Sequence, residues 1–156
     1  PLKVAAKIDK QDEAYFQREI KPLFEDPQIE YIGEIQEKDK SEFLGNAKAL
    51  LFPINWPEPF GLVVIEAMAC GTPVVAFRRG SVPEVISEGE TGLIVDTIPE
   101  AVTEVQQKIE GISRASCRRI FEERFSSRRM AEDYLKIYQQ QINLNINREF
   151  FLKKSV

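Results

Sequence analysis

The strongest constraint on the fold is a repeated alternation of short apolar segments with segments of helical character. Five segments have the composition of buried strands: residues 2–8, 28–32, 49–52, 74–77 and 93–95. Residues with near-helical spacing or helix-capping chemistry follow each of them. Strands that alternate with helices in this way form parallel sheets. The sequence therefore predicts an α/β fold, with a Rossmann-like parallel sheet covered by helices on both faces.

Local signals mark several helix ends. Ser81 with Glu84, and Thr97 with Glu100, have the spacing of a capping box. Gly71, two residues before a proline, is typical of a helix C-cap. The third strand is entirely apolar, so we expect cover on both of its faces.

The 156 residues suffice for one domain with a hydrophobic core. We place that domain at residues 1–142, truncated at its N-terminal edge. Residues 113–142 are expected to be helical, with a break near residues 125–126. For residues 143–156 a helical extension, a disordered tail and an interface all remain open.

Composition excludes several classes of function. A net charge of −4 argues against a nucleic-acid-binding surface. The chain has no histidine, which removes Ser-His-Asp and Cys-His catalysis and any histidine-containing metal site. No apolar run reaches the length of a membrane-spanning helix, and the first residues lack a signal-peptide pattern.

Cys70 and Cys117 are widely separated and lack metal-ligand spacing. Two reduced thiols in the cytoplasm are favoured over a disulfide, which the sequence leaves open. The chain starts within an expected strand and without methionine, so we expect it to be a fragment.

The loop after the third strand has the features of a ligand site. Glu58 lies between two prolines, which stiffen its backbone and fix the direction of its carboxylate. Gly61 allows the chain to approach a ligand closely where the next helix begins. The unpaired amides at such a helix start suit a phosphate.

Two nearby residues allow more than one interpretation. Glu66 is the only ionisable residue of an apolar helix expected over residues 61–69, and a buried carboxylate needs a partner. That partner is either an arginine or lysine in a structural ion pair, or a diol of a ligand. Trp56 either stacks on a ligand or packs under the loop.

The segment from Glu58 to Glu66 has the E-x7-E signature, in its EPFGL form, of retaining family 4 (group 1) glycosyltransferases. Further blocks at residues 66–76, 80–86 and 89–96 match that family in order and spacing. The chain therefore resembles this family from about Leu2 to Tyr138. The resemblance implies the C-terminal half of a GT-B fold, in which the active site lies between two Rossmann-like domains.

The resemblance also implies roles for individual residues. Glu58 would contact hydroxyls of the donor sugar near the reacting carbon, and Glu66 would hold the ribose hydroxyls. The amides of Phe60, Gly61 and Leu62 would meet the sugar or the diphosphate. The loop that contains Gly33 and Ile35 would contact the base.

The family usually binds the diphosphate with an arginine and a lysine from a segment upstream of this chain's first residue. Lys7, Arg78 and Arg79 are candidate substitutes, although surface solvation is the simpler interpretation of each. No Asp-x-Asp motif occurs, which favours chemistry without a metal ion. We therefore expect no metal and no cofactor, only a nucleotide diphosphate sugar as the donor substrate.

The sequence thus predicts the donor-binding domain of a retaining, hexosyl-type glycosyltransferase in the cytoplasm. Its partners would be a nucleotide-sugar donor and an N-terminal GT-B domain with the acceptor site, with no nucleic acid. The full-length parent protein would have no transmembrane segment, but it could contact a membrane peripherally. The isolated chain is expected to be inactive.

Three alternatives remain. One is a degenerate nucleotide-sugar-binding module without activity, and another is a GT-B nucleotide-sugar epimerase. A dinucleotide-dependent oxidoreductase also fits the layer pattern, but no G-x-G-x-x-G follows the first strand.

Overall fold

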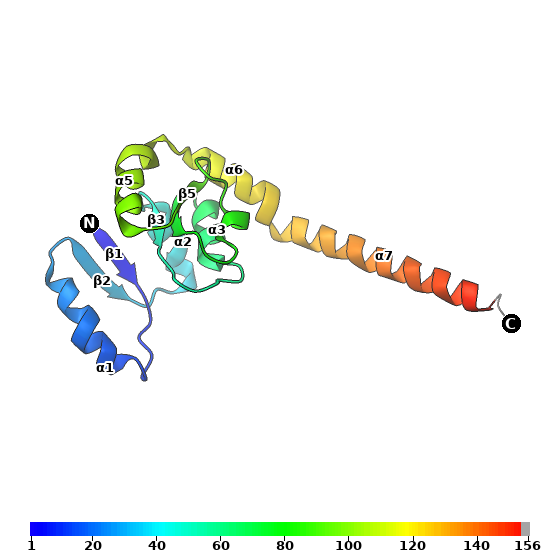
Figure 1. Ribbon diagram of the computed structural model, residues 1–156, viewed down its shortest axis with the longest axis horizontal. Helices are drawn as coiled ribbons and strands as arrows, with labels where there is room; N and C mark the ends of the chain where they lie inside the picture. The colour runs from blue at the N-terminus through cyan, green and yellow to red at the C-terminus, as the bar shows by residue number, and fades with distance from the viewer. Residues whose placement is uncertain (154–156) are drawn as a thin grey trace. The chain divides into compact units, whose positions relative to one another are not determined.

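The computed structural model describes the backbone of residues 1–153 and the side chains of residues 1–144. The chain divides into two compact units, unit 1 (Pro1–Phe43) and unit 2 (Leu44–Val156). All strands are parallel and helices follow them, so the predicted α/β fold is confirmed (Figure 1). The strands form two sheets, one in each unit, rather than the one that the alternation predicts.

Unit 1 is a two-stranded sheet with one helical connection. Strands β1 (Leu2–Ala5) and β2 (Ile29–Gly33) pair in parallel, with a shift of register between Val4 and Ala5. The connection runs through α1 (Glu13–Tyr15), a π-helical turn η1 (Phe16–Ile20) and a 3₁₀ turn η2 (Lys21–Glu25).

Aromatic rings hold unit 1 together. Phe24 stacks on Tyr31 with ring centroids 5.1 Å apart, and Phe16 lies tilted against both. None of residues 1–43, all of which the structure describes, is fully buried. The sheet of unit 1 therefore rests on partly covered aromatic contacts.

Unit 2 contains a three-stranded sheet and the main hydrophobic core. Its strands, β3 (Leu50–Phe52), β4 (Val74–Phe77) and β5 (Gly92–Val95), lie in the order β3-β4-β5. β5 is buried throughout, and β4 is buried except at its last residue. The expected cover on both faces of β3 is wrong, because Leu51, whose side chain points to one face of this edge strand, remains 49% exposed.

Several helices belong to unit 2, and the unit boundary falls within α2 (Glu37–Gly45). The others are α3 (Leu62–Ala69), α4 (Val82–Val85), α5 (Ile98–Lys108), the 3₁₀ turn η3 (Ile109–Gly111), α6 (Arg114–Phe125) and α7 (Ser127–Lys153). Helix α3 packs against α6. The apolar groups between β4, β5 and the start of α6 include Val75, Leu93 and Cys117.

The break predicted near residues 125–126 is confirmed, because Ser126 is extended between α6 and α7. Helix α7 then continues without interruption to Lys153 (Figure 1). The domain boundary at residue 142 stays a prediction, and residues 154–156 of the expected tail lie outside the described residues. Over the described part of the chain, no helix combines the length and apolar character of a membrane span.

One predicted cap is confirmed and the other is wrong. The Thr97 side chain accepts a hydrogen bond from the Glu100 amide at 3.3 Å and begins α5. The Ser81 side chain makes no cap bond, because its backbone is helical (φ −75°, ψ −9°) and a capping side chain needs an extended backbone there.

Both cysteines are free thiols. Cys117 is fully buried in the core, and this burial raises the pKa of its thiol. A neutral thiol inside an apolar core behaves as a small hydrophobic group.

We predict that Met68→Ala lowers the free energy of unfolding by about 2–5 kcal/mol, because the Met68 side chain is fully buried and its loss leaves a cavity. Leu62→Ala, in the same helix, is the matched control. Its side chain is 66% exposed, so the expected change is below about 0.5 kcal/mol. Urea unfolding of both variants measures the difference, and equal losses would contradict this assignment of the core.

Candidate functional site

The candidate site begins where β3 ends and the chain turns into α3. The turn is tight, since the Glu58 amide donates to the Trp56 carbonyl at 2.9 Å. The Glu58 carbonyl in turn accepts from the Ser81 amide, also at 2.9 Å. The backbone of Glu58 is thus tied to its own loop and to the turn that follows β4.

The carboxylate of Glu58 is held at both oxygens. The Trp56 indole N–H donates to Oε2 at 3.1 Å, and the Gly61 amide donates to Oε1 at the same distance. Glu58 is half-buried, and the rings of the flanking prolines are exposed. The predicted stiffening by proline is therefore supplemented by two hydrogen bonds that fix the direction of the carboxylate.

Gly61 forms the start of α3. Its backbone is left-handed (φ +79°, ψ +65°), a conformation that strongly favours glycine. The Gly61 carbonyl accepts from the Val64 amide at 3.0 Å. The amides of Leu62 and Val63 have no intrahelical acceptor, as in the first turn of any helix. Two donors thus lie immediately after the Glu58 carboxylate.

The Gly61 amide already has a hydrogen-bond acceptor in the structure, and its expected role toward the ligand stays a prediction. The sequence predicts that this amide meets the sugar or the diphosphate, whereas in the structure it donates to Glu58. The bond joins the two predicted site residues. A ligand that used the Gly61 amide would have to displace Glu58 Oε1 or share its donor.

Gly80 belongs to the site, although sequence reasoning gave it no role. A Cβ atom at Gly80 would lie 2.2 Å from the Glu58 carbonyl oxygen and 2.5 Å from its nitrogen. Gly80 also has a positive φ of 50°. The only signal in the sequence was its place in a family block, so its contact with Glu58 required the structure.

Ser81, next to Gly80, also contacts Glu58. Ser81 is 9% exposed, and its hydroxyl oxygen is buried without a hydrogen-bond partner among the described residues. Its amide is the donor to Glu58. The turn at residues 80–81 therefore supports the Glu58 backbone by close packing and one hydrogen bond.

Phe60 connects the loop to the junction of α6 and α7. The residue is 42% exposed, and its ring meets the Phe125 ring edge to face, with centroids 6.3 Å apart. The Arg124 guanidinium lies 4.8 Å from the centroid of the Phe125 ring and donates to carbonyls at the end of α4. Phe60 thus packs against a residue at the end of α6 that Arg124 also contacts.

Glu66 is half-buried rather than buried as expected. Val64, Ala67 and Met68 form the buried face of α3. Glu66 lies one turn after the exposed Leu62, on the side of the helix that the core does not cover. Glu66 is therefore only partly covered by the rest of unit 2.

The remaining predicted residues lie in unit 1. Gly33 ends β2 with φ +75°, and its carbonyl accepts from the Ala6 amide at 3.0 Å. Ile35 is half-buried in the connection that leads to α2. The structure places Glu58, Phe60, Gly61, Leu62 and Glu66 together in unit 2, whereas Gly33, Ile35 and Lys7 belong to unit 1.

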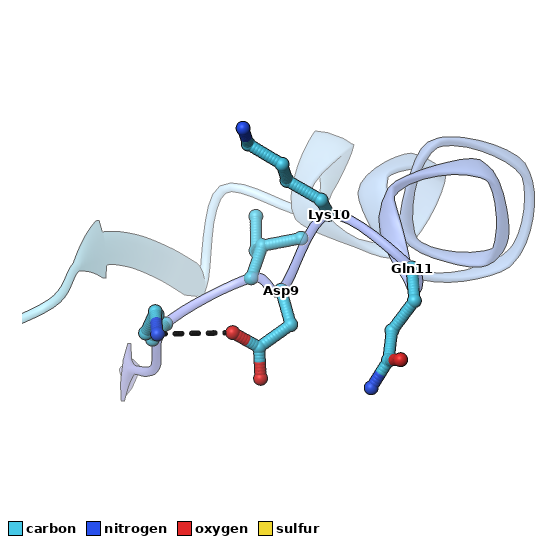
Figure 2. Close-up of a pocket in the computed structure, with 5 residues that line it drawn as sticks. Asp9, Lys10 and Gln11 are labelled. Atoms are coloured by element: carbon cyan, nitrogen blue, oxygen red, sulfur yellow. Dashed lines mark ion pairs between the residues drawn. The ribbon is translucent and has the colours of Figure 1, made fainter.

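Lys7 forms an ion pair with Asp9 at 3.0 Å, and both side chains are more than half exposed. Figure 2 shows this pair in the shallow hollow between β1 and α1, with Lys10 and Gln11 pointing away from each other. An exposed pair of this kind contributes little to stability. The surface interpretation of Lys7 therefore accounts for its position in this structure.

Arg78 and Arg79 also have partners on the surface of unit 2. Arg78 pairs with Asp96 at 3.6 Å, and Arg79 donates to the Asn55 side chain at 3.3 Å. Within the described residues, no three Cys, Asp or Glu side chains gather closely enough to hold a metal ion.

Comparisons with known proteins agree on the family and the fold. The sequence model described as "Glycosyl transferases group 1" matches residues 4–126. A probable sucrose-phosphate synthase of Thermosipho melanesiensis is 37% identical over 100 residues, which cover 62% of this chain and 23% of that protein.

Two solved structures are similar to the chain. Sucrose-phosphate synthase from Thermosynechococcus elongatus matches with a TM-score of 0.76 and 26% identity, over 92% of this chain and 39% of that one. HepE from Anabaena, in complex with UDP and glucose, matches with a TM-score of 0.71 and 19% identity, over 88% of this chain and 39% of HepE. The chain thus spans less than half the length of these relatives.

We predict that Gly80→Ala is more destabilising than Gly89→Ala. Both glycines have a positive φ, which costs an alanine about 1–2 kcal/mol, but a Cβ at Gly89 meets nothing within 4 Å. Gly80→Ala adds the clash with the Glu58 backbone, so we expect a further loss of about 1–3 kcal/mol. Thermal unfolding of the two variants measures this difference, and equal stabilities would show that the Gly80 contact carries no energy.

Proposed function

Because this chain belongs to the glycosyl transferases group 1 family, we propose that it is the donor-binding half of a retaining glycosyltransferase. The whole enzyme would move a sugar from a nucleotide diphosphate sugar to an acceptor. The observation that carries the proposal is the fixed Glu58 carboxylate, which lies directly before the free amides of α3.

The donor would extend from Glu58 along the start of α3. Glu58 would accept hydrogen bonds from hydroxyls of the sugar, since an ionised carboxylate is an acceptor only. The Leu62 amide at the helix start would donate to the diphosphate, where the positive end of the helix dipole favours an anion. Glu66, one helical turn after Leu62 and half-buried, would accept the ribose hydroxyls.

The roles proposed for the residues of unit 1 are those that the family resemblance implies. The carbonyl and amide groups near Gly33 and Ile35 would contact the base. Lys7 would have to leave Asp9 before it could meet the diphosphate. We therefore assign Lys7 the weakest role of the set.

Departure of the nucleotide diphosphate places negative charge on its phosphates, and aligned backbone amides stabilise that charge without moving. Metal independence is part of the proposal and is supported by the missing Asp-x-Asp motif. No cofactor is needed for transfer between an activated sugar and a hydroxyl group. Retention of anomeric configuration follows from the resemblance of Glu58–Glu66 to the family signature.

The acceptor site would lie in an N-terminal GT-B domain, which supplies the other side of the cleft. This part of the proposal is supported by the coverage, since the chain matches only 39% of the sucrose-phosphate synthase structure. We place the enzyme in the cytoplasm, in keeping with two free thiols. A hexose is the first donor sugar to test, because glucose and UDP occur in the HepE structure.

Two alternatives share the same site. An epimerase would use the bound nucleotide sugar without an acceptor, and a degenerate module would bind it without reaction. Transfer to an acceptor by the full-length protein separates the proposal from both.

We predict that Glu66→Ala weakens nucleotide binding by about 10- to 100-fold, the effect of losing hydrogen bonds to a charged group. Calorimetric titration with UDP, GDP and ADP, and with the glucose derivative of each, identifies the nucleotide and measures the loss of affinity. Glu123→Ala removes an exposed carboxylate of α6 and serves as the control.

In the same titrations, Glu58→Ala should leave the affinity for the bare nucleotide unchanged and lower the affinity for the nucleotide sugar. Equal nucleotide affinity in the wild type and Glu66→Ala would refute this division of roles.

We predict further that the 156-residue chain transfers no sugar by itself, because it lacks the proposed acceptor half. Incubation with a labelled nucleotide sugar and a panel of hydroxyl acceptors tests this. A labelled product formed by the chain alone would contradict the proposed division of the enzyme.

A further inference from the structure

Trp56 is the single tryptophan of the sequence, and the residue is 57% exposed. Its indole N–H donates to Glu58 Oε2 at 3.1 Å. A tryptophan in a core contributes the apolar area that it buries, but more than half of the surface of Trp56 remains exposed to solvent. Packing alone therefore does not explain why a tryptophan lies two residues before Glu58.

The hydrogen bonds of Glu58 define what its carboxylate can still accept. A carboxylate offers about four lone-pair sites, two on each oxygen. The Trp56 and Gly61 donors occupy one site on each oxygen. About two sites remain, one on each oxygen, which suits the two adjacent hydroxyls of a sugar ring.

The two anchors act together. With one donor on each oxygen, rotation of the carboxylate about its last bond would break both hydrogen bonds. If the Trp56 donor were lost, Gly61 alone would hold the group, and the carboxylate plane could turn about that single contact. A binding group that is already oriented loses less entropy when the ligand binds.

We propose that Trp56 is a positioning residue that orients the Glu58 carboxylate toward two hydroxyls of the donor sugar. This inference rests on the proposed function and goes beyond the E-x7-E pair. Trp56 acts through Glu58 and contributes nothing to nucleotide affinity. A bound sugar displaces water from around the carboxylate, and the lower local dielectric strengthens the indole hydrogen bond in the sugar-bound state.

The test compares Trp56→Phe with the wild-type chain. Phenylalanine keeps an aromatic ring and removes the N–H donor. The measured quantity is the ratio of the affinities for the nucleoside diphosphate-glucose and for the bare nucleoside diphosphate, with the base selected among UDP, GDP and ADP. We expect this ratio to fall about tenfold, with the affinity for the bare nucleotide unchanged. Tyr15→Phe, at an exposed aromatic residue of unit 1, is the control and should change neither affinity.

Trp56 itself provides a second measurement. Since no other tryptophan is present, tryptophan emission of the wild-type chain reports on this one ring. Glucose in the site should change the emission beyond the change caused by the bare nucleotide. If the role of Trp56 were purely structural, Trp56→Phe would lower the melting temperature and leave the affinity ratio unchanged.

The outcomes distinguish a failure of the proposed function from a failure of the role proposed for Trp56. If the wild-type chain binds no nucleotide and no nucleotide sugar, the proposed function fails and this inference fails with it. If the wild type prefers the nucleotide sugar and Trp56→Phe keeps the full preference, the inference alone is overturned. An unchanged emission on addition of the nucleotide sugar, with binding shown by calorimetry, also overturns it.

Discussion

The close approach of Gly80 to the backbone of Glu58 is the contact on which the rest of the site depends. No side chain fits between the two segments, and the Ser81 amide bonds to the Glu58 carbonyl at the same point. With its backbone fixed, Glu58 reaches the Gly61 amide and the Trp56 indole. A carboxylate thereby lies at the positive end of α3, next to two first-turn amides that have no intrahelical acceptor.

The opposite end of α3 is fixed as firmly. Gly71 takes a left-handed backbone after Cys70, and the Thr72 amide returns to the Ala67 carbonyl at 2.8 Å. Arg118 of α6 donates to the Ala69 carbonyl at 2.7 Å. Held at both ends and packed through Met68, α3 is a rigid support for groups that must be oriented before a ligand arrives.

Sequence reasoning recovered what depends on neighbours along the chain. Strand and helix alternation, the break at Ser126, the Thr97 cap and the glycine at the end of α3 follow from local patterns, and the structure confirms them. Sequence reasoning failed where segments that are distant along the chain meet in the structure. The contact of Gly80 with Glu58, the helical backbone of Ser81 and the exposure of Leu51 at a sheet edge each depend on tertiary arrangement. Glu66 was misjudged because an apolar helix can still leave one face uncovered.

The central claim is that a donor diphosphate binds at the start of α3, beside Glu58. Nuclear magnetic resonance of the labelled chain tests it most directly, by following backbone amides during titration with a nucleotide sugar. We predict that the Leu62 and Val63 amides shift most in unit 2, because they are the unpaired donors there. Large shifts confined to α5 or α7, with the amides of Leu62 and Val63 unmoved, would contradict the account.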